Sequence, residues 1–158
     1  MVHLRLIEEK DNQAVGEIVQ ASLKNRGLDL PGTAYFDPHL FSLYDYYQMP
    51  KRAYWVLEKD GVVIGGCGIG PFGNGASIGE LQKLYIRDEE QGKGYAHVLM
   101  VQALTFAEAH YDACYIDTFA SLKGANRLYE KYGFKKLDAP IEGSEHNACD
   151  TWFLKEFK

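Results

Sequence analysis

The sequence has 158 residues and a formal net charge of −5 at pH 7, with 46% hydrophobic and 25% charged residues. A chain of this length fits one domain that buries roughly 70% of the surface exposed by its unfolded form, and the composition is that of a folded globular protein. The negative balance argues against a nucleic-acid-binding protein, which needs clustered Lys and Arg, and it weakly favours a cationic substrate.

The first residues, Met1 to Arg5, lack the basic stretch followed by an apolar stretch that marks a signal peptide. No later apolar run approaches the ~20 residues that span a bilayer. We therefore expect a cytoplasmic protein that does not associate with membranes. Its three cysteines are widely spaced and lack the spacing of metal ligands, so we expect free thiols and no metal.

The first part of the chain predicts one strand and two helices. Alternating residues indicate a strand over His3 to Ile7, and apolar residues at helical spacing indicate a helix between Asp11 and Gly27. A second helix is predicted from Asp37 to Tyr47, where a cap residue and a first-turn proline begin a further run of helical spacing.

Turn residues then separate the remaining elements. Three antiparallel strands are predicted over residues 54–58, 62–68 and 77–86, followed by a long helix over 94–111, a strand over 113–118, a helix over 124–132 and strands over 134–137 and 150–157. This order predicts the α/β (α+β) class: a single domain over residues 1–158 with a mixed, mostly antiparallel sheet flanked by helices.

Two glycine motifs suggest phosphate binding, but only one has the required context. "GIGPFG", residues 68–73, matches the dinucleotide-binding string, which requires a helix that begins at its third glycine. Here Asn74-Gly75 and a strand follow, so we interpret the motif as part of a hairpin.

"QGKGYA", residues 91–96, lies between a strand and a long helix. Gly92 and Gly94 let successive amide groups turn toward one point, and the helix dipole favours an anion there. Lys93 adds a positive charge. The motif therefore predicts a diphosphate cradle, although a helix start without a ligand has the same local pattern.

The second half of the chain decides between these alternatives. Gln91-x-x-Gly94-x-Ala96 after "LQKLYI", followed by "ANRLYEKYGF" at residues 125–134, resembles the GNAT family of N-acetyltransferases. The resemblance covers roughly residues 54–137. It implies a GNAT-like fold and the transfer of an acetyl group from acetyl-CoA (coenzyme A) to a primary amine of a small molecule, or to a protein amine, by direct attack in a ternary complex.

The resemblance also implies which residues bind the cofactor. The backbone of the cradle would hold its pyrophosphate, and a strand that separates from residues 113–118 would pair with its pantetheine arm. The cofactor-binding residues are then Leu84, Tyr85, Ile86, Gln91, Gly92, Lys93, Gly94, Tyr95 and Ala96. The asparagine that the family often places at position 122 is Leu122 here, so Asn126 is expected to take over that contact.

Acetyl transfer needs a group that accepts the proton of the amine and a group that protonates the departing thiolate. Tyr129, in the LY pair of the late helix, matches the family's thiolate partner. Glu80 is the leading candidate base, because it interrupts a strand-forming segment and, by simple alternation, shares a face with Leu84. Asp117 and Glu142 are weaker candidates for the base.

The acceptor amine is expected to lie among the early helices and late strands, where Tyr35, Tyr44 and Asp45 are predicted to bind a cationic small molecule. Residues 142–150 are expected to form a loop over this pocket, with His146 in solvent. The resemblance also suggests a homodimer through the last strands.

The sequence leaves two other functions open. One is a catalytically weak sensor that binds acyl-CoA, and the other is a nucleotide-binding module that uses GIGPFG.

Overall fold

The computed structural model describes residues 1–144 and 146–158. Its α-helices are α1 (Asn12–Asn25), α2 (Leu43–Tyr46), α3 (Tyr95–His110) and α4 (Lys123–Lys131). Its strands are β1 (Val2–Leu6), β2 (Ala53–Lys59), β3 (Val62–Pro71), β4 (Ile78–Ile86), β5 (Ala113–Thr118), β6 (Lys135–Leu137) and β7 (Thr151–Glu156). Short 3₁₀ turns occupy Glu9–Asp11, Ala34–Phe36 and Asp88–Glu90.

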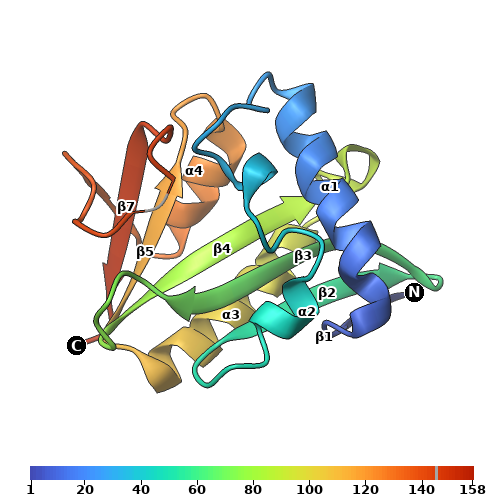
Figure 1. The fold of residues 1–158 in the computed structure, drawn as a ribbon, viewed down its shortest axis with the longest axis horizontal. Coiled ribbons are helices and arrows are strands. Elements are labelled where there is room, and N and C mark those ends of the chain that lie inside the picture. The colour runs from blue at the N-terminus through green and yellow to red at the C-terminus, as the bar shows by residue number, and fades with distance from the viewer. Residues whose placement is uncertain (145) are drawn as a thin grey trace.

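One seven-stranded sheet in the order β1-β2-β3-β4-β5-β7-β6 forms the centre of the molecule (Figure 1). β4 and β5 pair in parallel, whereas the other neighbouring strands pair antiparallel. Figure 1 shows α1 and α2 in front of the sheet and α3 behind it. Tyr129 of α4 shares a core cluster with Leu99 of α3, which places α4 on the same side as α3. The predicted mixed sheet flanked by helices is confirmed.

The sheet opens between its two parallel strands. Pairing between β4 and β5 begins at Ile78 with Ala113 and ends at Glu80 with Tyr115, although β4 continues to Ile86. Among the described residues, no strand pairs with the edge of β4 that faces β5 beyond Glu80, so this edge is open to a ligand.

A β-bulge in β4 changes which side chains share a face. Gly66 pairs with Tyr85 and Gly68 with Gln82, so β4 holds one more residue than β3 in this interval. The extra residue is Lys83, whose φ is 51°, and the Tyr54 hydroxyl donates a hydrogen bond of 2.9 Å to its carbonyl oxygen.

The bulge contradicts the prediction that Glu80 and Leu84 lie on one face. Leu81, Leu84 and Ile86 pack in the cluster on the α3 side, whereas Tyr85 packs in the cluster on the α1 side. Simple alternation failed because one inserted residue reverses the orientation of every side chain that follows it.

The helix predicted from Asp37 to Tyr47 forms only in its last turn, where α2 spans Leu43–Tyr46. Asp37 is extended, with a ψ of 132°, and turns follow it before the single turn of α2. Leu40 is buried at 2% exposure while Phe41 is 41% exposed. The Asn12 side chain accepts a hydrogen bond from the Tyr44 amide at 2.9 Å, so a contact from α1 caps this short helix.

The hairpin interpretation of GIGPFG agrees with the structure. β3 continues through its first half to Pro71, and no helix begins at Gly73, which lies in the loop before β4. A Cβ at Gly68 would lie 2.6 Å from the Tyr54 ring, so this glycine makes room for an aromatic side chain rather than for a phosphate. Within residues 1–144 and 146–158, no helix has both the length and the apolar character needed to cross a membrane.

Candidate active site

A cavity of about 910 Å³ lies where β4 and β5 separate. Its walls come from the end of α1, from β4 and β5, from the start of α3 and from α4. Most of the predicted site residues line it: Glu80, Leu84, Tyr85, Ile86, Gln91, Gly92, Gly94, Tyr95, Ala96 and Tyr129. The opening of the sheet therefore brings the predicted cofactor and catalytic residues together.

The start of α3 has the geometry of an anion cradle. Gly92 and Gly94 have φ values of 79° and 84°, and a Cβ built on either would meet no heavy atom within 4 Å. The amides of residues 92–96 donate to none of the described residues, and no side chain caps the helix. Unpaired amides at a helix N-terminus favour a bound anion.

Contacts from α1 hold the loop that leads into this cradle. Arg26 Nη2 lies 3.0 Å from Asp88 Oδ1 and 3.3 Å from Gln91 Oε1. Gln91 in turn donates to the carbonyl oxygen of Ile86 at 3.1 Å. The cradle is thus fixed to both α1 and the end of β4.

Lys93 differs from its neighbours in the motif, because it does not line the cavity. Its ammonium group lies 2.9 Å from Glu90, which also pairs with Lys59. The backbone amides, rather than this side chain, face the cavity.

Glu80 lines the cavity from the last position at which β4 pairs with β5. Burial raises its pKa to about 7, although a hydrogen bond from Gln82 opposes the shift. That bond is 2.9 Å long, and the Tyr47 hydroxyl fixes the Gln82 amide by donating to its oxygen at 2.6 Å. A carboxyl group with a pKa near neutrality can accept a proton.

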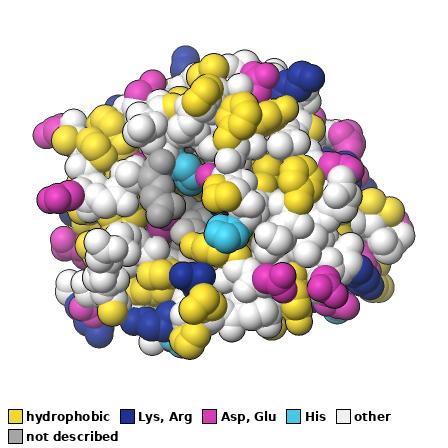
Figure 2. All heavy atoms as spheres, in the orientation of Figure 1, with side chains coloured by type: hydrophobic (Ala, Val, Ile, Leu, Met, Phe, Trp, Pro, Cys, Tyr) yellow, Lys and Arg dark blue, Asp and Glu magenta, His cyan; other side chains and the backbone are white. Residues whose placement is uncertain are grey.

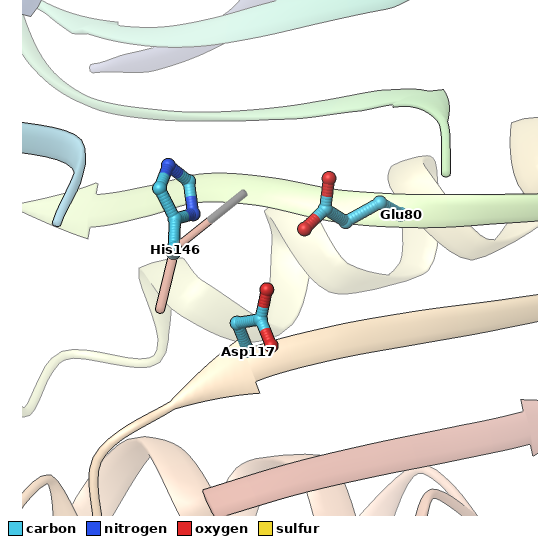
Figure 3. Close-up of side chains that lie close together, drawn as sticks. All are labelled: Glu80, Asp117 and His146. Atoms are coloured by element: carbon cyan, nitrogen blue, oxygen red, sulfur yellow. The ribbon is translucent and has the colours of Figure 1, made fainter. Parts of the chain in front are cut away.

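Asp117 and His146 lie beside Glu80, with one oxygen or nitrogen atom of each of the three within 4.8 Å of the others (Figure 3). The expectation that His146 lies in solvent is wrong, because it lines the cavity and its Nε2 lies 3.0 Å from Asp37 Oδ1. Asp37 also pairs with Lys83 at 2.6 Å. We call Glu80, Asp117 and His146 the polar corner of the cavity.

Tyr129 lines the cavity from α4 and is 6% exposed. Burial raises the pKa of its phenol well above the usual value, so the hydroxyl keeps its proton at neutral pH. No hydrogen bond joins that hydroxyl to another of the described residues.

The remaining predicted residues lie elsewhere. The Asn126 amide donates to the Phe119 carbonyl at 2.9 Å and accepts from the Thr118 hydroxyl at 3.2 Å. It holds the link between β5 and α4 and is not part of the cavity wall, so a cofactor contact through Asn126 stays a prediction.

Tyr35, Tyr44 and Asp45 are also absent from the cavity wall. Asp45 is exposed, and Tyr44 packs against the cluster under α1. The expectation that they bind the acceptor came from the resemblance to the family, and it stays a prediction. Asp37, Gln82 and Lys83 were missed because no local pattern distinguishes them.

One cavity thus contains an open sheet edge, an amide cradle and buried acid–base groups. Together these features suit an enzyme that transfers a chemical group. The Acetyltransferase (GNAT) family model matches residues 22–134. An uncharacterized N-acetyltransferase of Escherichia coli K12, YjgM, is 37% identical over 156 residues, which cover 97% of this chain and 93% of that protein. The chain therefore belongs to the GNAT acetyltransferase family, which confirms the resemblance and the class of enzyme, an acyltransferase.

Solved structures agree with this fold. An acetyltransferase of the GNAT family from Staphylococcus aureus Mu50 superposes with a TM-score of 0.81 at 15% identity, over 100% of both chains. YncA, a putative acetyltransferase from Salmonella typhimurium solved with acetyl-CoA, has a TM-score of 0.79 at 18% identity, over 100% of this chain and 95% of its own.

Proposed function

We propose that this protein transfers an acetyl group from acetyl-CoA to the primary amine of a small molecule, by direct attack in a ternary complex. One observation carries the proposal: free amides, an open strand edge and a carboxyl group with a near-neutral pKa line the same cavity. The solved structure of the YncA protein with acetyl-CoA supports the choice of cofactor.

The residues present fit this cofactor. The amides of residues 92–96 suit a pyrophosphate, because they donate to none of the described residues and the space above Gly92 and Gly94 is open. The open edge of β4 at Leu84, Tyr85 and Ile86 suits the amides of the pantetheine arm. When bound, the cofactor supplies a thioester whose carbonyl carbon is open to attack by an amine.

Three roles are then distributed over this chain. The Glu80 carboxylate accepts the proton of the acceptor amine, and a backbone amide of the β4 edge polarises the carbonyl oxygen. The Tyr129 hydroxyl holds a proton over the cavity at neutral pH, in place to protonate a leaving thiolate. Leu84 and Ile86 turn apolar side chains to the α3 side and help to exclude water.

The test is a comparison of two glycine variants. Gly94→Glu places bulk and negative charge in the cradle, so calorimetry should show the affinity for acetyl-CoA reduced at least tenfold. Gly61→Glu is the matched control, because Gly61 has the same φ of 84° and equally open surroundings but lies in the turn between β2 and β3. Equal affinities in the two variants, or no heat of binding in the wild type, would contradict the proposal.

A further inference from the structure

The polar corner is assembled from three segments that are far apart in the sequence. Glu80 comes from β4, Asp117 from β5 and His146 from the segment between β6 and β7. Figure 3 shows the three side chains turned toward one another. All three line the cavity that the proposed transfer would use.

Each member of the corner is held by a further hydrogen bond. Gln82 donates to Glu80 at 2.9 Å. Tyr115 and Ser144 donate to the two oxygens of Asp117 at 2.8 and 2.7 Å. These contacts orient the carboxylates before any ligand binds, so little reorganisation accompanies binding.

His146 is oriented by Asp37, whose two oxygens lie 3.0 and 3.2 Å from Nε2. Lys83, with a side chain only 9% exposed, pairs with the same carboxylate and keeps it ionised. A carboxylate can only accept hydrogen bonds, so Nε2 carries the proton of the neutral ring. The other ring nitrogen, Nδ1, is turned toward Glu80 and Asp117 as an acceptor (Figure 3).

We infer that His146, positioned by Asp37, is a second proton-accepting residue of the reaction and the third acceptor for a primary ammonium group held by Glu80 and Asp117. This inference rests on the proposed function. Three acceptors match the three N–H bonds of a primary ammonium, whereas a tertiary ammonium offers only one. The acceptor class is therefore a primary alkyl amine.

The proton step balances within the corner. One N–H bond of the ammonium breaks and leaves its electron pair on the amine nitrogen as the attacking lone pair. This first proton forms a bond to Nδ1 of His146, and Asp37 stabilises the imidazolium that results. Once the nitrogen is acylated, a second N–H bond breaks and its proton goes to the Glu80 carboxylate, so the amide keeps one N–H.

The charges that face His146 suit this role: Asp37, Glu80 and Asp117 are acidic, and Lys83 is basic. Burial lowers the pKa of His146, but the hydrogen bond and charge of Asp37 and the charge of Glu80 outweigh it and raise the pKa. An ammonium that enters the corner repels a protonated ring, so amine binding frees Nδ1 to accept.

The first test follows the ring by NMR. We expect the pKa of His146 to fall by about one unit in Asp37→Asn, because an opposite charge is lost. In the wild type the pKa of His146 should also fall when n-butylamine is added. A pKa of His146 that responds to neither change would overturn the inference, whether or not the protein turns over.

The second test is the pH profile of kcat/KM with acetyl-CoA and n-butylamine. We expect His146→Gln to lower kcat/KM about tenfold at neutral pH. The acidic limb of the kcat/KM profile should move to higher pH in this variant, because the charge of His146 normally lowers the pKa of Glu80. His39→Gln is the matched control and should keep the wild-type profile.

The possible failures can be distinguished. A wild-type profile in His146→Gln, with turnover intact, overturns this inference and leaves the proposed function standing. Wild-type protein that binds no acetyl-CoA overturns the proposed function instead. Turnover that requires an added divalent cation and stops with a chelator would assign the corner to a metal ion and would also overturn the inference.

Discussion

Burial raises the pKa of both Glu80 and Tyr129, but the consequence differs for the two side chains. Burial raises the pKa of Glu80 to about 7, which makes a carboxyl group a useful base near neutral pH. Burial also raises the pKa of Tyr129 well beyond neutrality, which keeps a phenol protonated. One desolvated cavity therefore favours a base on β4 and an acid on α4.

The role of Tyr129 predicts a separation of kinetic parameters. Tyr129→Phe should lower kcat at least tenfold while the affinity for acetyl-CoA stays within about twofold, because only the proton donor is removed. Steady-state kinetics and calorimetry measure the two quantities. An unchanged kcat would exclude Tyr129 as the acid, and a protein that binds the cofactor but shows no turnover in either form would be a sensor.

At the scale of elements, Asp37 links three parts of the fold. It precedes the turns that lead to α2, it pairs with Lys83 at the bulge of β4, and it accepts from His146 between β6 and β7. Although burial opposes the shift, these two partners lower its pKa to about 2.

A pH-dependent contribution to stability follows from that shift. A carboxyl group whose pKa is lowered in the folded state stabilises the protein above its unfolded value near 4, and the contribution is lost as the pH falls toward 2. Asp37→Asn should therefore reduce the free energy of unfolding by about 2 kcal/mol at pH 7 and by about half as much at pH 3. Denaturant titrations at both pH values measure this difference.

The exposed Asp29→Asn variant serves as the control and should keep wild-type stability at both pH values. A cost of Asp37→Asn that is the same at pH 7 and pH 3 would mean that its charge is not the stabilising feature.

The elements that the sequence predicted well are those with an unambiguous burial pattern. β5 forms over residues 113–118 as predicted, because a short apolar run between turns suits an interior strand. The prediction of the second helix was right only for its last turn, because spacing alone could not show that Leu40 is buried from a turn. The polar corner was only partly predictable, since His146 and Asp37 are 109 positions apart and meet only through tertiary packing.

At the scale of the whole molecule, the cavity also accounts for the surroundings of the three cysteines. Cys67 and Cys114 are fully buried in the sheet, whereas Cys149 is half-buried and lines the cavity. Burial raises the pKa of Cys149 to about 12, which leaves little thiolate at neutral pH.

This arrangement predicts how the native protein reacts with a maleimide. One thiol per chain should be labelled slowly, and all three should react after unfolding in guanidinium chloride, as mass spectrometry can count. Cys149→Ser should abolish the native labelling. Comparable rates for the three thiols would contradict a tightly packed sheet around Cys67 and Cys114.

The two halves of the cavity differ in how the chain builds them. One continuous stretch, residues 91–96, supplies the amide cradle. The polar corner instead combines Glu80, Asp117 and His146 from three distant segments, and Asp37 holds His146 from a fourth. Substitutions in the loops before α2 and before β7 can therefore change which amine is accepted. The amide cradle that binds the cofactor stays unchanged. Divergence among relatives of this protein should accumulate in those loops, and grafting them between relatives should exchange acceptor preference without loss of cofactor affinity.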